Sequence, residues 1–252
     1  MDDKGAVAHN GPIYDPLSWP HKCAEIYVNP HDIALKGGMK IGPLNVQPIL
    51  LYIPDTTYFQ DRWETVQKHL QERGIENLIQ VAGIHGTRFG IDGTHTYDVD
   101  NPGSGFKIGP GYTAEFLSVY MMYNIMSVLP ATHFLKLECD VDMIPDFLHH
   151  LSRELENVPE DFDFLWVGSC CMTGKTHKLI KGNVYQFDQS TGYPFGGHCY
   201  IVAKKAIPYI IQTQRDAYAS SDLNLCFHTF PNLKCYGIFP RLATQKNTDL
   251  PL

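Results

Sequence analysis

From residue 47 onward, apolar and polar positions follow patterns that predict regular secondary structure. Residues 48–53 form a short apolar run that is typical of a strand. Residues 58–73 follow the period of a helix, and Gly74 is expected to end it. One face of this helix carries Phe59, Trp63, Val66 and Leu70. Because residues 77–82 have the pattern of a second strand, this segment is predicted to be a β-α-β unit with parallel strands.

The rest of the chain continues to alternate between strands and helices. Further helices are predicted over residues 112–129, 145–155, 204–213 and 219–227, and further strands over residues 132–137, 162–167, 200–203 and 234–239. Such alternation is typical of an α/β domain, in which helices flank a mixed, mainly parallel sheet. We expect a single domain over residues 47–252. It is preceded by an irregular N-terminal arm over residues 1–46, which is rich in Pro, Gly, His and Asn.

Composition narrows the class of protein. Of the 252 residues, 44% are apolar and 19% are charged, which is ordinary for a globular protein and excludes intrinsic disorder of the whole chain. No apolar run reaches the roughly 18 residues of a membrane-spanning helix, and the first residues lack the pattern of a secretory signal. We therefore expect a cytoplasmic protein. The seven cysteines include no C-x-x-C pair, which argues against a zinc knuckle and favours a reducing compartment.

The net charge of -7 is unevenly distributed along the chain. Residues 131–165 carry nine acids and two bases, whereas residues 166–252 carry nine bases and four acids. An acidic segment followed by a basic one suits a site that binds a metal ion and an anionic ligand. Chance variation of surface charge is the alternative interpretation.

Three carboxylates directly follow the predicted strand 132–137. They belong to Glu138, Asp140 and Asp142, which are spaced two residues apart. In an extended backbone, side chains two residues apart point to the same side, so Asp140 and Asp142 are predicted to converge. Two oxygen ligands at the end of a strand fit Mn²⁺ or Mg²⁺, with other positions left for water and phosphate oxygens. A solvated acidic turn is the alternative.

Six blocks of residues match one family pattern in order along the chain. They are residues 49–55 with Asp61-Arg62-Trp63, residues 81–86, residues 108–111 with Ser118 and Tyr120, residues 137–141, residues 196–201, and Ser221-Asp222 with residues 236–240 and Gln245. In these blocks the chain resembles the GT-A glycosyltransferases. More specifically it resembles family 25, which includes lipopolysaccharide and collagen galactosyltransferases. Cys139, His85 and Tyr120 depart from the family pattern, and the first 46 residues have no counterpart in it.

The resemblance implies a metal-dependent enzyme of the GT-A type. It would move a sugar from a nucleotide-sugar donor, a UDP-sugar, to a hydroxyl group of a glycan, glycolipid or glycoprotein acceptor with inversion. The implied ligands of Mn²⁺ (or Mg²⁺) are Asp140, Asp142 and His228, and the implied general base is Asp222. The implied donor-binding residues are Ile53, Pro54, Asp55, Arg62, Lys175, Lys178, Gly197 and His198.

Each of these residues also has a simpler structural interpretation. Ser220, Ser221 or Asp222 can start the helix that follows, and His228 can be an ordinary surface or core histidine. Lys175 and Lys178 can belong to a solvated loop, and Arg62 can pair with a neighbouring acid. The aromatic side chains of the same region, Trp166 and Tyr193, suit either sugar stacking or a plain hydrophobic core.

Three other functions stay open at this point. One is sugar transfer to a modified nucleic-acid base, which the acidic net charge disfavours. Another is a non-catalytic nucleotide-sugar-binding module of the same fold, suggested by the departures at 85, 120 and 139. The third is a metal-dependent phosphoesterase or nucleotidyltransferase, which would need further His or acid ligands from other strands.

Overall fold

The computed structural model describes residues 38–52, 57–84, 110–169, 177–188, 192–214 and 220–246, with side chains from Trp63 in the first helix and Ala114 in the second. Its helices are α2 (Thr57–Glu72), α3 (Pro110–Val128), α4 (Phe147–Leu155), α5 (Ile207–Thr213) and α6 (Ser221–Asn224). Two 3₁₀ turns, η3 (Lys204–Ala206) and η5 (Phe230–Asn232), and one π-helical turn, η4 (Leu225–Thr229), adjoin α5 and α6. No helix among these residues is long and apolar enough to cross a membrane.

The described strands form one mixed sheet. They are β1 (Met39–Ile41), β2 (Leu44–Tyr52), β3 (Ile79–Ala82), β4 (His133–Glu138), β5 (Val141–Met143), β6 (Phe164–Gly168), β7 (Lys178–Lys181), β8 (Val184–Phe187), β9 (Cys199–Ala203), β10 (Cys235–Ile238) and β11 (Ala243–Gln245). Their order is β1-β2-β4-β9-β6-β10-β8-β7, while β3 pairs with β2, and β11 joins β5 to β6. Strands β3, β2 and β4 are parallel, as are β6 and β10, and β9 lies antiparallel between β4 and β6.

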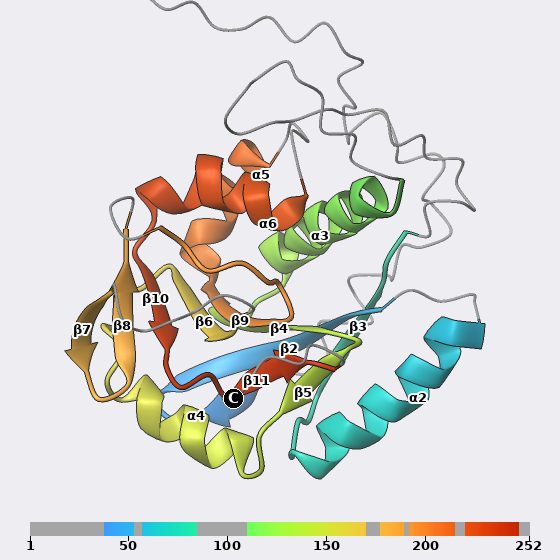
Figure 1. Ribbon diagram of the computed structural model, residues 1–252, viewed down its shortest axis with the longest axis horizontal. Helices are drawn as coiled ribbons and strands as arrows, with labels where there is room; N and C mark the ends of the chain where they lie inside the picture. Colours follow the sequence, from blue (N-terminus) through green and yellow to red (C-terminus); the bar gives the residue numbers. More distant parts are fainter. Residues whose placement is uncertain are drawn as a thin grey trace, which may run out of the picture.

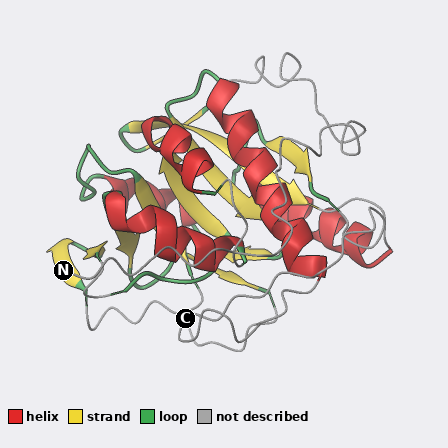
Figure 2. Ribbon diagram, turned by 90° about the horizontal axis from the view of Figure 1, so that it is seen from above, coloured by secondary structure: helices red, strands yellow, loops and turns green. Residues whose placement is uncertain are grey.

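Helices cover both faces of this sheet (Figure 1), which confirms the predicted class of an α/β sheet flanked by helices. Helices α3, α5 and α6 lie on one face, and α2 and α4 lie on the other; Figure 2 gives the view from above, with helices over the strands. Each face has its own hydrophobic core. The core under α3 includes Ile49, Leu51, Phe134 and Trp166, and the core over α4 includes Leu50, Leu135, Leu165 and Phe147.

Strand β4 brings two charged side chains into the interior on the α3 side. Phe134 belongs to the core under α3, whereas Leu135 and Leu137 belong to the opposite core. Because side chains alternate across a strand, Lys136 and Glu138 point to the same face as Phe134. Lys136 is only 1% exposed, since β4 lies between β2 and β9. The fold thus places an ammonium group and a carboxylate at the carboxyl end of a central strand.

The hydrophobic pattern predicted the longer elements correctly. The helices expected over residues 58–73, 112–129 and 145–155 correspond to α2, α3 and α4 within a few residues. The expected strands correspond to β2, β3, β4, β6, β9 and β10. Five strands of three or four residues were missed, namely β1, β5, β7, β8 and β11. Such short strands contain too few residues to establish a period of two.

One feature of the sheet was not specified by the sequence prediction, and another differs from it. Strand β9 follows the β7–β8 hairpin instead of a helix, so no crossover connection brings it parallel to its neighbours. Residues 39–41 and 44–46 were assigned to the irregular arm, but they form β1 and the beginning of β2. That assignment was wrong because this hairpin is short and turns at Gly42, whose φ is 54°. Residues 1–37 lie outside the described part of the chain.

The two cores predict how truncation of a side chain changes stability. Leu50 is fully buried in β2, and Val128 at the end of α3 is 64% exposed. We expect Leu50→Ala to lower the free energy of unfolding by about 2–5 kcal/mol, because it leaves a cavity between sheet and helices. Val128→Ala should change it by less than about 0.5 kcal/mol. Urea denaturation measures both values, and equal effects would contradict the described packing of β2.

Candidate functional site

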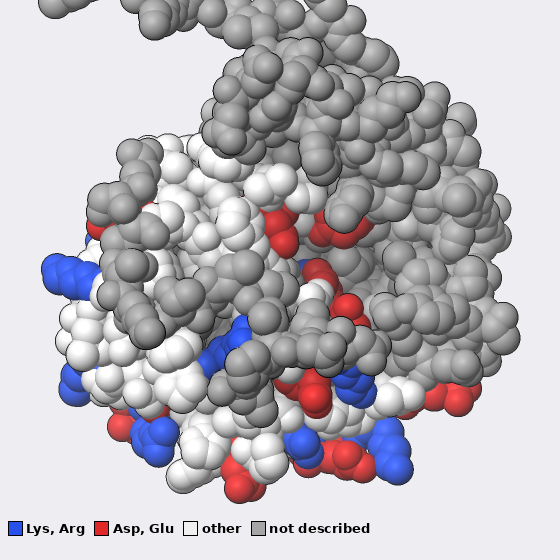
Figure 3. All heavy atoms as spheres, viewed as in Figure 1, with Lys and Arg blue, Asp and Glu red and all other residues white. Residues whose placement is uncertain are grey.

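Carboxylates from three elements gather where α3 and α6 meet the carboxyl end of β4. Figure 3 shows acidic side chains in a hollow near the centre of this face. A Cβ atom placed on Gly197 would lie 3.0 Å from Glu138 Oε1, 3.1 Å from Lys136 Nζ and 3.3 Å from Asp222 Oδ1. These three charged groups therefore surround one point beside the Gly197 backbone. A larger residue at 197 would force them apart, so glycine suits this position.

The Lys136 ammonium is the cation of this cluster. It donates hydrogen bonds to Glu138 Oε1 and to the backbone carbonyl of Gly197, and it lies 5.3 Å from the centre of the Tyr200 ring. An ammonium group removed from water needs such partners, because its desolvation costs several kcal/mol. Lys136 in this way ties the end of β4 to the loop that leads into β9.

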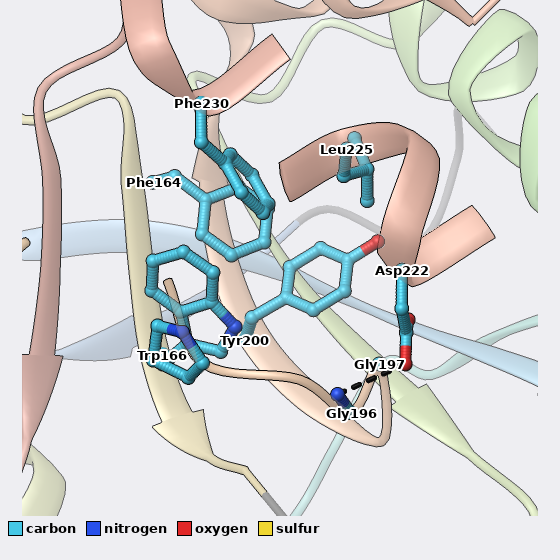
Figure 4. A pocket seen from close by; sticks show the side chains of 9 residues that line it. Phe164, Trp166, Gly196, Gly197, Tyr200, Asp222, Leu225 and Phe230 are labelled. Atoms are coloured by element: carbon cyan, nitrogen blue, oxygen red, sulfur yellow. Dashed lines mark hydrogen bonds between the residues drawn. The ribbon is translucent and has the colours of Figure 1, made fainter. Parts of the chain in front are cut away.

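Asp222 lies in the first turn of α6 and faces the same loop. Its Oδ2 accepts a hydrogen bond of 2.9 Å from the Gly196 backbone N–H (Figure 4). Of the three residues that could start this helix, Ser220 is the N-cap of α6, so the N-cap role falls to a neighbour of Asp222. Burial and the neighbouring Glu138 carboxylate raise the pKa of Asp222, while Lys136 and the Gly196 N–H oppose that rise. The result is a carboxylate whose affinity for a proton exceeds the ordinary value.

Glu115 of α3 is a further carboxylate that binds the first turn of α6. Its Oε2 accepts a hydrogen bond of 3.3 Å from Ser221 N, and its Oε1 is hydrogen-bonded to Ser221 Oγ. Burial, together with the negative charges of Asp222 and Glu138, raises the pKa of Glu115 to about 8. Glu115 is therefore a neutral carboxylic acid at pH 7.

Aromatic rings form the wall of a pocket beside Asp222. The pocket is lined by Phe164, Trp166, Pro194, Gly196, Gly197, Tyr200, Asp222, Leu225 and Phe230. In Figure 4 the Tyr200 ring lies between the other aromatic side chains and Asp222. The Tyr200 hydroxyl is hydrogen-bonded to the Tyr123 hydroxyl of α3 at 2.6 Å. One carboxylate thus stands at the edge of an otherwise apolar wall, which is a common composition for a ligand site.

His198 directly follows the Gly196-Gly197 pair in the sequence, and it is 1% exposed. Its ring nitrogens have no hydrogen-bond partner of good geometry among the described residues, although the Ala243 carbonyl lies close enough to favour a proton on the ring. Burial nevertheless lowers the pKa of His198 to about 4, with Lys136 acting in the same direction and Glu138 opposing it. His198 is therefore neutral near pH 7, and its backbone carbonyl accepts a hydrogen bond from Glu138 N at 3.1 Å.

The structure does not bring Asp140, Asp142 and His228 together as a group of three. Residues 139 and 140 form a turn, so the extended backbone assumed in the sequence argument is interrupted at Asp140, and the convergence of Asp140 and Asp142 stays a prediction. Asp142 lies in β5, is 51% exposed and has His69 Nε2 3.5 Å from its Oδ1. His228 is an exposed residue of η4. Across the described ranges, no three His, Cys, Asp or Glu side chains are grouped to hold a metal ion.

Several predicted donor-binding residues fall outside this cluster or outside the described chain. Lys178 is exposed on β7, which is separated from β4 by β9, β6, β10 and β8. Arg62 lies in α2, and its side chain is not among those described. Ile53, Pro54, Asp55 and Lys175 lie outside the described residues. Gly197 is the predicted donor contact that the fold brings next to Asp222, and His198 follows it in the same loop.

Sequence reasoning missed Lys136 and Glu115, although each had a visible signal. Lys136 is a lone charge inside the apolar strand that precedes the carboxylates. Glu115 is the single charged residue of α3, whose other described side chains are apolar or uncharged. A charge in an otherwise apolar element has to find a compensating partner, so such residues indicate where elements meet.

Comparisons with known proteins do not assign the chain to a family. No protein-family model and no curated protein sequence matches it. Several solved structures are similar to it, among them two transferases. One is a glycosyltransferase involved in the glycosylation of the major capsid of PBCV-1, with 11% identity over 81% of this chain and 94% of that chain and a TM-score of 0.46. The other is mannose-1-phosphate geranyltransferase from Thermus thermophilus, with 11% identity, 78% and 74% coverage and a TM-score of 0.38.

The buried ammonium predicts a large stability effect at one position. Lys136→Met removes the cation and leaves buried carboxylates uncompensated, so we expect a loss of about 3–5 kcal/mol in the free energy of unfolding. The control is Lys205→Met, since Lys205 is 54% exposed and pairs with Asp163 at 3.1 Å. That exposed pair should contribute less than about 1 kcal/mol. The description of the cluster is wrong if urea denaturation gives the two variants the same stability.

The lowered pKa of His198 predicts a dependence of stability on acid. A histidine whose folded pKa is depressed contributes stability that is complete above its unfolded pKa, 6.5, and is lost as the pH falls toward about 4. The difference in free energy of unfolding between wild type and His198→Asn should therefore shrink by up to about 1.4 kcal/mol per pH unit in this window. A difference that stays constant from pH 7 to pH 4 in denaturation experiments would mean that His198 is not held neutral.

Proposed function

We propose that this protein is an inverting glycosyltransferase that moves a sugar from a UDP-sugar donor to a hydroxyl group of a glycan, glycolipid or glycoprotein acceptor. The observation that carries the proposal is the placement of Asp222. Its half-buried carboxylate is held by the Gly196 N–H at the edge of an aromatic pocket, beside Glu138 and Lys136. The order of sequence blocks that resembles family 25 supports the same function.

In the proposed reaction Asp222 is the general base. It accepts the proton of the acceptor hydroxyl while the acceptor oxygen bonds to the anomeric carbon of the donor. The bond from that carbon to the diphosphate breaks on the opposite side, so UDP leaves with the electron pair and the configuration is inverted. A base works best when its pKa approaches the working pH, and burial and Glu138 raise the pKa of Asp222 in this direction.

The pocket wall and the glycine pair provide positioning. Trp166 and Tyr200 line the inner wall of the pocket, but each is only 2% exposed and belongs to the hydrophobic core, so they shape the site from within. Gly196 and Gly197 carry no side chain, so the ligand can approach the backbone next to Asp222. His198, neutral and buried behind them, keeps this loop in place through its carbonyl bond to Glu138 N.

We propose Asp140 and Asp142 as the ligands of Mn²⁺ or Mg²⁺. The donor set fits such an ion, because both residues supply hard oxygen atoms from the turn and strand that follow β4. Two carboxylates suffice for this class of ion when substrate phosphates supply further ligands. When bound, the metal would stabilise the negative charge that develops on the departing diphosphate. His228 is not needed in this set.

The test separates donor binding from transfer. A thermal-shift panel of UDP-glucose, UDP-galactose and UDP-N-acetylglucosamine, each with and without Mn²⁺, identifies the donor by a raised melting temperature. Asp140→Ala/Asp142→Ala should abolish the Mn²⁺-dependent shift. Asp222→Asn should keep the shift but lower UDP release by about 100-fold or more, because it removes the base and preserves the shape.

The outcomes of this panel are distinct. Loss of binding as well as turnover in Asp222→Asn would show that Asp222 holds the donor instead of acting as the base. A well-folded wild type that binds none of these sugars and releases no UDP would contradict the proposed function. Hydrolysis of free nucleotide without any dependence on the sugar would point to a phosphoesterase instead.

A further inference from the structure

We propose that Glu115 is the positioning residue for Asp222, and this inference rests on the proposed function because it gives Asp222 the role of general base. Glu115 belongs to α3 and binds both the backbone N–H and the hydroxyl of Ser221, the residue before Asp222. Ser221 is only 3% exposed, so both hydrogen bonds are shielded from water. Through them, one carboxyl group of α3 fixes the first turn of α6.

The first turn of α6 has no cap of the ordinary kind. The N-cap residue, Ser220, makes no side-chain hydrogen bond to the helix. The helix itself spans four residues before it continues into the π-helical turn η4, so it has little stability of its own. Glu115 supplies from another helix the acceptor that an N-cap side chain normally gives. The orientation of the Asp222 carboxylate therefore depends on a contact between α3 and α6.

The charges around Glu115 indicate whether its carboxyl group is protonated. It faces Asp222 and Ser221 of α6 and Glu138 and Lys136 of β4, with the hydroxyl groups of Tyr123 and Tyr200 nearby. Three carboxylates thus share one ammonium group in a buried space, and a proton on one of them lowers the excess negative charge. A pKa of about 8 for Glu115 assigns that proton to it at pH 7, and leaves Asp222 free to accept one.

This arrangement makes glutamine the matching substitution for Glu115. Ser221 donates both hydrogen bonds to Glu115. In Glu115→Gln the amide oxygen can still accept from Ser221 N, and the NH₂ group can donate to Ser221 Oγ if the hydroxyl turns its own hydrogen away, so both contacts are kept. Glu115→Ala removes both contacts. The control is Glu154→Gln, because Glu154 is another glutamate withdrawn from solvent, 2% exposed, but lies on α4 and binds Asn183.

The first measurement needs no donor. Hydrogen–deuterium exchange of the amides of Ser221–Asn224 should rise at least about tenfold in Glu115→Ala. It should stay near the wild-type rate in Glu115→Gln and in the Glu154→Gln control. Unchanged protection of α6 in a folded Glu115→Ala variant would overturn the positioning role, and this result is readable even if the protein transfers no sugar.

The second measurement is the pH profile of UDP release from the three UDP-sugars named above. In Glu115→Ala we expect kcat to fall by about 30-fold or more with a much smaller change in KM, because the base is displaced while the donor still binds. Glu115→Gln should keep the wild-type kcat within about threefold at about pH 6.5 and lose the decline of activity that wild type shows above about pH 8. A Glu115→Gln variant as slow as Glu115→Ala would contradict the proposal, since it would mean that the negative charge is needed. If wild type itself releases no UDP, the proposed function fails, and the exchange experiment still decides the role of Glu115.

Discussion

The ammonium group of Lys136 is withdrawn from water in the middle of the sheet, and the geometry of the site follows from how that charge is compensated. Strand alternation forces the side chain toward α3, since Leu135 and Leu137 occupy the opposite core. The described partners of the ammonium are the Glu138 carboxylate and the Gly197 carbonyl. To supply them, the end of β4 and the loop before β9 must meet. This meeting requires a residue without a side chain at 197.

One cation is not enough for the acids that collect around it. Glu138 comes from β4, Asp222 from α6 and Glu115 from α3. The charges of Asp222 and Glu138 act on Glu115, and the charge of Glu138 acts on Asp222. The energy of this set of acids is lower when one of them keeps a proton. The proton is favoured on the carboxyl group that is most desolvated and least stabilised as an anion by the ammonium. The acids that compensate the charge of Lys136 therefore differ in protonation. Glu115 keeps a proton, and Asp222 can accept one. Environments that push neighbouring pKa values apart are typical of acid–base catalysis.

The sequence predicted helices and strands better than the contacts between them. A long apolar face indicates its element by its period, because it must be buried whichever element packs against it. It did not indicate that β9 reverses direction, since a strand's direction depends on its connection. Residues two apart share a side only while the backbone stays extended, so the rule holds for Lys136 and Glu138 but cannot be extended through the turn at residues 139 and 140. Asp222 was found through a family resemblance. Lys136 and Glu115 were missed because their role appears only when β4 and α3 are seen to face α6.

Burial alone does not explain the perturbed acids, as a comparison of two glutamates shows. Glu154 of α4 is 2% exposed, and burial would raise its pKa. Hydrogen bonds from Asn183 and Arg153 outweigh that effect, so the pKa of Glu154 falls below its usual value. Burial contributes most to the raised pKa of Glu115, the Asp222 and Glu138 carboxylates add to it, and the hydrogen bond from Ser221 only partly offsets them. A buried carboxyl group well supplied with donors therefore stabilises a fold as an anion, whereas one placed among other acids keeps a proton that chemistry can use.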